Sequence, residues 1–212
     1  MQVDNGMKRP RVLKAVEEAI IEAAEIVRGG GVVVYPTETV YGLGCDPLNP
    51  EAVYRLLRVK GRGRKPLPVA ASSVERAREI AYFTPLAERV ASLFLPGPLM
   101  LILRAKVQFP RGVTCGLETV GVRVPDHPVA LRLAELSGGC LVSTSANKSG
   151  EPPPRDVEEA VAQIGGEVDL ILDAGPSPLG RPSTILDLTS EKPRVLREGP
   201  IPVERVLEAL RG

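Results

Sequence analysis

The fold is decided by residues 32–44, which read VVVYPTETVYGLG. The opening run VVVY has the length and the β-branched content of a buried strand, and Pro36 ends it. Hydroxyl groups and two glycines, Gly42 and Gly44, follow the strand directly. Because strand ends open into a crevice at the edge of a sheet, these hydroxyls can hold a small polar ligand, and the glycines let it approach the backbone. An ordinary polar turn is the alternative interpretation of the same residues.

A helix is predicted before this strand, since apolar residues recur there at helical spacing. Three glycines at positions 29–31 end the pattern, whose apolar members are Val16, Ile20, Ala23, Ala24 and Val27. Residues 1–11 are mostly polar and contain a second methionine, Met7. We expect them to form a flexible lead.

Helices and strands alternate through the rest of the chain. Asn49 and Pro50 have the residue types of an N-cap and a first helical residue. Further helices are predicted over 73–82, 85–95, 128–136 and 155–164, and strands over 99–103, 119–124, 140–143, 170–172, 183–188 and 194–196. The order lacks a strict βαβ rhythm. We therefore predict an α/β fold with a twisted, mixed-direction β-sheet and flanking helices, as a single domain over residues 1–212.

The composition restricts the classes of protein. Hydrophobic residues make up 43% and charged residues 25%, close to the average of globular proteins. The net charge of +1 argues against a surface that wraps nucleic acid, and the absence of Trp argues against base-stacking platforms. Three widely spaced cysteines indicate neither a disulfide framework nor a zinc site. No apolar run is long enough to span a membrane, so we expect a cytoplasmic protein.

A basic cluster at residues 58–65 reads RVKGRGRK and packs five cations into eight residues. Arg offers a rigid fork of donors and Lys a mobile point charge, a combination that suits a polyphosphate. The cluster is not a P-loop, because the pattern G-x-x-x-x-G-K-[ST] is absent. A solvated basic loop is the alternative interpretation.

Other polar residues also follow predicted strands. Residues 143–150 read STSANKSG and offer hydroxyl and amide donors for phosphate or ribose, although a helix-capping turn has the same composition. Thr119 and Arg123 share one face of a strand, about 13 Å apart, and could hold opposite ends of a ligand. Ser183 and Arg197 lie at the ends of later strands.

A catalytic triad is not predicted, because the chain has one histidine, His127, and no G-x-S-x-G pattern. His127 lies where a helix is predicted to begin, so capping explains it as well as catalysis, and no role is assigned to it.

Taken in order, the motifs resemble those of the threonylcarbamoyl-adenylate synthase family, the YrdC-like proteins. The resemblance covers nearly the whole chain and lacks the second domain of the longer members. It rests on PTETVYGLG from Pro36, Lys60-x-Arg62 before Pro66, PGPL from Pro96, TVGVRVP from Thr119, STSAN from Ser143, PSTI from Pro182 and VLREG from Val195.

The resemblance implies a concave, positively charged cavity that binds ATP, L-threonine and bicarbonate. The products would be threonylcarbamoyl-AMP and pyrophosphate, in the first step of a tRNA modification. Mg²⁺ is expected to accompany ATP, with no metal ligands from the protein. The product would pass to a tRNA threonylcarbamoyl-transferase complex, and a direct contact with tRNA is left open.

The resemblance also implies roles for individual residues. L-threonine would be bound by Thr39, Thr119, Arg123 and Ser183. ATP would be bound by Lys60, Arg62, Lys65, Thr119, Ser143, Ser145 and Arg197, and the catalytic set would be Lys60, Arg62, Ser145 and Asn147. Two positions depart from the family pattern, since Ala70 stands where members often carry His and Pro153 where some carry Ser.

The chemistry of this reaction needs no protein nucleophile, which agrees with the lack of a triad. A neutral threonine amine adds to the bicarbonate-derived carbon, and the resulting carbamate oxygen attacks the α-phosphate in line. The protein would hold the reactants and stabilise charge on the phosphates.

Two other functions remain open from the sequence. The first is a non-enzymatic protein that binds double-stranded RNA or tRNA through residues 58–65, and the second is a domain that uses carbamoyl phosphate. Pyrophosphate release that requires L-threonine and bicarbonate distinguishes the synthase from both, whereas salt-sensitive RNA binding without such release indicates the RNA-binding protein.

Arg62→Ala is predicted to lower turnover by about two to three decades, because one preorganised donor to the phosphates is lost. The measurement is the steady-state rate of pyrophosphate release. Activity within about threefold of the unchanged protein contradicts the role.

Overall fold

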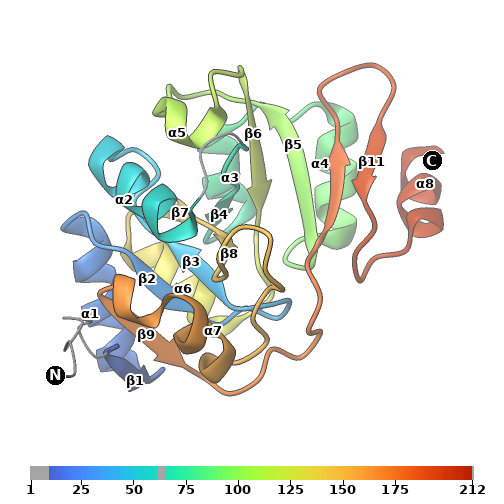
Figure 1. Cartoon of the computed structure of the whole chain (residues 1–212). Helices are drawn as coiled ribbons and strands as arrows, with labels where there is room; N and C mark the ends of the chain where they lie inside the picture. The colour runs from blue at the N-terminus through green and yellow to red at the C-terminus, as the bar shows by residue number, and fades with distance from the viewer. Residues whose placement is uncertain (1–9, 62–64, 212) are drawn as a thin grey trace, which may run out of the picture.

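The computed structural model describes residues 10–61 and 65–211, which form two mixed β-sheets surrounded by helices (Figure 1). The first sheet contains, in spatial order, β1 (Val12–Lys14), β9 (Leu170–Asp173), β2 (Val33–Tyr35), β3 (Gly42–Gly44) and β8 (Thr144–Ser145). The second contains β11 (Arg194–Arg197), β10 (Thr184–Asp187), β5 (Leu99–Arg104), β6 (Thr119–Arg123), β4 (Val69–Ala71) and β7 (Cys140–Val142).

Both sheets mix strand directions, as predicted. In the first sheet β2 runs parallel to β9 and antiparallel to β3. In the second, β5 runs parallel to β10 and antiparallel to β6. The sequence predicted one sheet, and the difference arises from strands of two or three residues, such as β3 and β8, that pair at the junction and carry no strand pattern.

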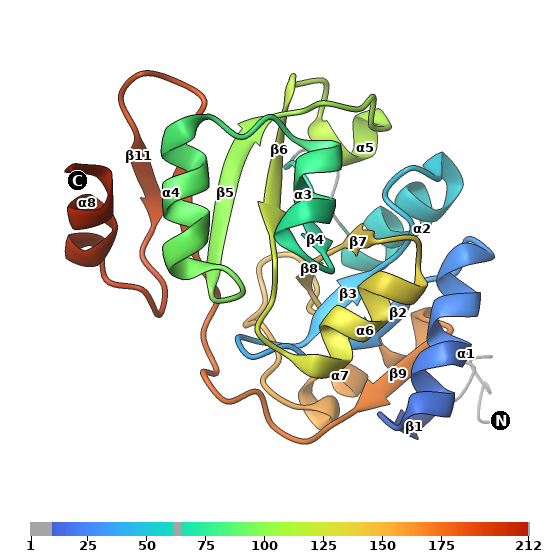
Figure 2. The same ribbon diagram turned by 180° about the vertical axis from the view of Figure 1, so that it is seen from behind.

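The helices cover the outer faces of the sheets. Behind the second sheet lie α3 (Val74–Ile80) and α4 (Pro85–Phe94), and the C-terminal α8 (Val203–Arg211) packs against α4 (Figure 2). Two further helices, α1 (Glu17–Arg28) and α6 (Pro128–Leu136), pack against each other. The remaining helical elements are α2 (Pro50–Lys60), α5 (Arg111–Thr114), α7 (Val157–Ile164) and the 3-10 turn η1 (Gly165–Glu167).

Strand β2 is buried on both faces and joins two hydrophobic cores. Val34 packs into the larger core, whereas Val33 and Tyr35 point the opposite way into a smaller core with α1 and α6. This explains why the run is apolar without alternation. Both cores consist mainly of Val, Leu, Ile and Ala, as the composition predicts.

The glycine after the PTETVY segment is required by packing. Gly42 pairs with Tyr35 across the antiparallel β2–β3 ladder, and a Cβ at Gly42 would lie 2.8 Å from Cζ of the Tyr35 ring. A side chain there would collide with a fully buried aromatic ring. The sequence explained this glycine by ligand approach, and the structure adds the Tyr35 ring as a cause.

Helix α2 begins as its sequence predicts and ends later than predicted. The Asn49 side chain accepts hydrogen bonds from the backbone N–H of Glu51 (3.0 Å) and Ala52 (3.2 Å), and Gly61 ends the helix in the left-handed region at φ 62°. The basic residues 58–60 therefore belong to the last helical turn, not to a loop as the sequence suggested. Their backbone carbonyls are consequently available as acceptors at the helix end.

Several elements were not predicted. Strands β1, β3, β4 and β8 and helix α5 have two to four residues, too few for a periodic pattern, whereas the nine-residue helix α8 at the C-terminus was missed in spite of its length. Val16 also differs from expectation: it is the N-cap of α1 and is 55% exposed, since the buried face starts only at Ala19. Of the predicted lead, residues 1–9 lie outside the described part of the chain, and the Arg11 carbonyl accepts a hydrogen bond from Ile171.

Within residues 10–61 and 65–211, none of the helices has the length and apolar character needed to cross a bilayer.

Asn49→Ala is predicted to lower the free energy of unfolding by about 1 kcal/mol, because two N–H groups at the start of α2 lose their acceptor. The midpoint of urea unfolding should fall while the m-value stays constant. Asn49→Asp is the matched control, since its carboxylate keeps the acceptor and should preserve the midpoint. An unchanged midpoint for Asn49→Ala contradicts the capping role.

Candidate functional site

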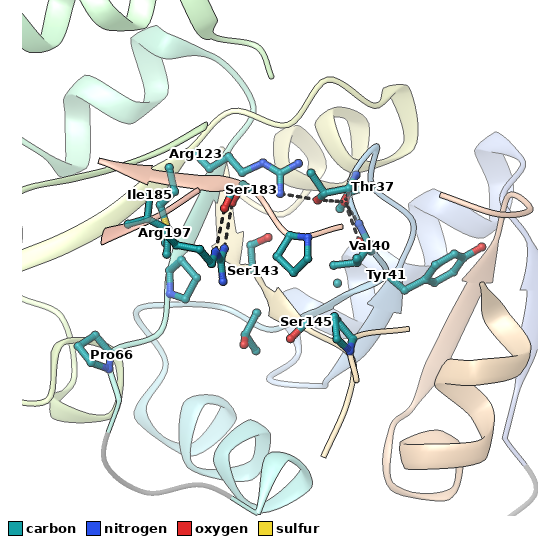
Figure 3. A pocket seen from close by; sticks show the side chains of 17 residues that line it. Thr37, Val40, Tyr41, Pro66, Arg123, Ser143, Ser145, Ser183, Ile185 and Arg197 are labelled. Atoms are coloured by element: carbon teal, nitrogen blue, oxygen red, sulfur yellow. Dashed lines mark hydrogen bonds between the residues drawn. The ribbon is translucent and has the colours of Figure 1, made fainter. Parts of the chain in front are cut away.

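A cavity of about 340 Å³ lies between the two sheets (Figure 3). Its walls come from the loop between β2 and β3, from β5, β6, β10 and β11 of the second sheet, and from the segment around β8. Among the described residues that line it there is no carboxylate. The lining is Thr37, Thr39, Val40, Tyr41, Gly42, Pro66, Pro68, Met100, Arg123, Ser143, Thr144, Ser145, Pro153, Pro182, Ser183, Ile185 and Arg197.

The loop after β2 is held in shape by Thr37. Its Oγ1 accepts from the backbone N–H of Thr39 (3.2 Å) and Val40 (3.3 Å) and donates to the Val40 carbonyl (2.7 Å). Threonine hydroxyls commonly stabilise turns in this way. The turn directs Thr39 toward Arg123, whose Nη1 donates to Thr39 Oγ1 at 2.8 Å.

Arg123 ends β6 at one side of the cavity and is only 8% exposed. Besides Thr39 it contacts the Gly97 carbonyl through Nε at 3.4 Å, and its Nη2 forms an ion pair with Glu38 Oε2 at 2.5 Å. The structure therefore brings together Thr39 and Arg123, as the resemblance implied, and it adds Glu38, to which the sequence gave no role.

Arg197 reaches the cavity from β11. Its Nε donates to the Ser183 carbonyl at 2.9 Å and its Nη2 lies 3.4 Å from Ser183 Oγ, as Figure 3 shows. Within the described residues no carboxylate lies within 4.0 Å of it. Burial lowers the pKa of Arg197 below its usual value, and the positive charge of Arg123 lowers it further. An uncompensated guanidinium that faces a second cation favours an anionic ligand.

Lys60 and Asn147 lie behind Ser145 and do not line the cavity. Lys60 is 2% exposed, and its Nζ donates to the Ser145 carbonyl at 2.7 Å and to Asn147 Oδ1 at 3.2 Å. The Asn147 amide nitrogen donates to the carbonyls of Lys148 (2.8 Å) and Glu151 (2.7 Å). Lys60 therefore contacts Ser145, which does line the cavity, and Asn147 is bonded to Lys60 and to the loop backbone.

The loop at residues 145–149 and the end of helix α2 are joined by hydrogen bonds, and each of the two supplies donors. While Lys60 donates to the loop, the backbone N–H of Ser149 donates to the Lys60 carbonyl at 2.9 Å. Lys148 Nζ donates to the Val59 carbonyl at 2.7 Å. These bonds satisfy carbonyls that the helix end would otherwise leave unpaired.

Besides Lys60 and Asn147, the expected site residues Thr119 and Lys65 are not among the described lining residues. Thr119 lies at the other end of β6 from Arg123. Gly121 stands between them on the same strand face, and a Cβ there would lie 3.0 Å from Met100 and 3.6 Å from Pro68, which both line the cavity. This face of β6 therefore borders the cavity. Lys65 is exposed beside Pro66. Arg62 lies outside the described residues.

Ala70 and His127 add no polar group to the cavity. Ala70 is fully buried in the smaller core. His127 precedes α6 as its N-cap residue, without a side-chain capping bond. Burial lowers the pKa of His127 below its usual value, and the negative charges of Glu38 and Asp126 offset part of this effect. The ring is therefore uncharged at neutral pH.

Sequence reasoning gave no site role to two apolar residues of the wall, Met100 and Ile185, although Ile185 ends the quoted PSTI motif. Met100 and Ile185 are register partners on β5 and β10. Each stands in an apolar strand that reads as core, and only the pairing of the strands shows that this face borders the cavity. Thr37, Pro66 and Pro182 had a signal, because they belong to or adjoin the quoted motifs.

A protein-built metal centre is not evident, since the described residues contain no group of three or more His, Cys, Asp or Glu side chains placed to hold an ion.

Known proteins share both the sequence and the fold of this chain. Residues 25–199 match the model of the Sua5, YciO and YrdC family, described as telomere recombination. Threonylcarbamoyl-AMP synthase of Pyrococcus abyssi is 41% identical over 198 residues, which are 92% of this chain and 58% of that protein. The putative threonylcarbamoyl-AMP synthase of Mycobacterium tuberculosis H37Rv is 44% identical over 195 residues, 90% of this chain and 88% of that protein.

Solved structures agree. The crystal structure of Pyrococcus abyssi Sua5 complexed with L-threonine superposes with a TM-score of 0.89 at 39% identity, covering 95% of this chain and 60% of that one. Escherichia coli YciO gives 0.81 at 32% identity, covering 92% and 95%. This chain thus spans little more than half of the Pyrococcus protein but nearly all of YciO. By sequence and by fold, the chain is a member of the Sua5, YciO and YrdC family.

Proposed function

We propose that this chain is a threonylcarbamoyl-AMP synthase, which converts L-threonine, bicarbonate and ATP into threonylcarbamoyl-AMP and pyrophosphate. The observation that carries the proposal is the cavity, which presents hydroxyl groups and two separate guanidinium groups without a carboxylate among its described lining residues. Relatives that are 41% and 44% identical carry the name of this enzyme, and the Pyrococcus relative binds L-threonine.

The electrostatics of the cavity suit the first chemical step. The threonine amine must be neutral to form a C–N bond with the bicarbonate-derived carbon, with loss of water. Arg197 has no carboxylate partner among the described residues, and no described lining residue is a carboxylate, so the cavity favours the neutral amine over an ammonium group. A general base of the protein is then not required.

The second step needs the carbamate oxygen and the α-phosphorus in line, while pyrophosphate leaves. We assign the threonine to the side of the cavity that Thr39 and Arg123 form. Ser183 and Thr119 keep their expected contact with the threonine, at its end nearer the nucleotide. The phosphates are assigned to Arg197, Ser143 and Ser145.

Lys60 donates to the Ser145 carbonyl and to the Asn147 side chain, and so brings its positive charge close to Ser145. We assign to Lys60 the stabilisation of phosphate charge through Ser145, although Lys60 does not line the cavity itself. Arg62 and Lys65 keep the phosphate roles expected from the motif.

Mg²⁺ fits this site as a partner of ATP and not as a resident ion. The described lining offers hydroxyls but no carboxylate, and Mg²⁺ prefers carboxylate and phosphate oxygens. We propose that it arrives on the phosphates, where it would neutralise their charge.

The RNA-binding alternative is less well supported, since the hydroxyl groups enclosed in the cavity have no part in binding a duplex. A cytoplasmic location, transfer of the product to a tRNA threonylcarbamoyl-transferase complex and direct contact with tRNA stay predictions.

The direct test of the proposal is mass spectrometry of the products formed from ATP, L-threonine and ¹³C-bicarbonate. We expect threonylcarbamoyl-AMP carrying one heavy carbon, together with pyrophosphate, and no such product when any substrate is left out. Pyrophosphate release that is independent of L-threonine rejects this function.

Arg197→Ala is predicted to raise the KM for ATP by about 10- to 100-fold, because a charged donor to the phosphates is lost. The matched control is Arg194→Ala on the same strand, whose guanidinium pairs with Asp187 and is 67% exposed. The control should leave the KM within about twofold. Equal effects of the two substitutions contradict the assignment of Arg197.

A further inference from the structure

Glu38 is a buried acid that the proposed reaction leaves without a role. It is 6% exposed and is absent from the cavity lining. In the described part of the chain its carboxylate accepts no hydrogen bond, although Oε2 lies 2.5 Å from Arg123 Nη2. A buried carboxylate without hydrogen bonds is costly, so its presence calls for a compensating function.

The position of Glu38 is fixed by its surroundings. Its carbonyl accepts from the Leu179 N–H at 2.9 Å, and Leu179 lies in the segment that joins β9 of the first sheet to β10 of the second. The Thr37 turn holds the loop on the other side. The backbone of Glu38 is thus fixed, and its buried carboxylate lies beside Arg123.

The two guanidinium groups of the cavity consequently differ in charge balance. Arg123 carries a fixed counter-charge, whereas the partners of Arg197 are the neutral carbonyl and hydroxyl of Ser183. A highly charged anion is attracted by a full charge and only weakly by a nearly neutral ion pair. A carboxylate can still accept hydrogen bonds from the donors that Arg123 has left.

We propose that Glu38 is a positioning and specificity residue, which reserves Arg123 for a singly charged carboxylate and directs polyphosphate to Arg197. The identity of that carboxylate as L-threonine rests on the proposed function. Glu38 acts through Arg123 and not as a base, since it does not border the cavity.

The test measures binding of inorganic pyrophosphate and of L-threonine by titration calorimetry, without turnover. The unchanged protein should bind one pyrophosphate per chain, which does not compete with L-threonine. Glu38→Gln keeps the shape and removes the charge. It should bind a second pyrophosphate that competes with L-threonine, and its affinity for L-threonine should fall about tenfold because Arg123 loses its ion pair and keeps only its bonds to Thr39 and Gly97.

Two variants serve as controls. Asp169→Asn removes the acid of another ion pair, with Arg55, outside the cavity, and should change neither ligand's binding. The double variant Glu38→Gln, Arg123→Gln should return to one pyrophosphate, since the released cation is gone.

Arg197→Gln provides an independent arm should Glu38→Gln fail to fold. With Glu38 in place, pyrophosphate binding should be lost and not transferred to Arg123. Two results overturn the proposal. One is that Arg197→Gln still binds pyrophosphate in competition with L-threonine. The other is that Glu38→Gln folds, binds only one pyrophosphate and keeps its affinity for L-threonine.

The outcomes also separate this inference from the proposed function. A protein that forms no threonylcarbamoyl-AMP but shows the pyrophosphate pattern lacks the proposed activity while keeping the division of charge. If the unchanged protein forms threonylcarbamoyl-AMP and folded Glu38→Gln still binds one pyrophosphate, the proposed activity is supported and the role of Glu38 is rejected.

Discussion

The burial of β2 on both faces is the constraint on which the rest of the structure depends. Val34 belongs to one core and Val33 with Tyr35 to the other, so a single strand ties the two cores together. Its carboxyl end consequently emerges at the junction of the two sheets, where the Thr37 turn and β3 begin. The cavity lies at this junction because polar loop residues end up opposite strands of the second sheet. The burial of β2 thus determines both the two-core fold and the location of the cavity.

Within that cavity the chain supplies placement and charge and no reactive side chain. Arg123 and Arg197 lie at separate positions of one hollow, each fixed by hydrogen bonds to neighbouring backbone carbonyls. Preorganised donors of this kind stabilise developing charge without reorganising during the reaction. The hydroxyl groups between them can orient neutral parts of a ligand. Such a site suits a reaction in which the substrates attack one another.

The sequence predicted what depends on local patterns. The N-cap of α2, the start of α6 and the strand after Gly31 follow from Asn49, Pro128 and the VVVY run, whose signals are contained in a few neighbouring residues. The division into two sheets could not be predicted, because β3 and β8 have only three and two residues, carry no strand pattern and pair only through tertiary contacts. Met100 and Ile185 read as core for the same reason. The motifs located Ser145 and Lys60, but only the structure shows that Lys60 lies behind Ser145.

Hydrogen bonds in both directions couple α2 to the loop at residues 145–149. The Lys60 side chain donates to the loop, and the loop donates to the last carbonyls of the helix. Neither can shift alone without loss of these hydrogen bonds, so the place of Ser145 in the cavity wall is tied to the position of the last turn of α2.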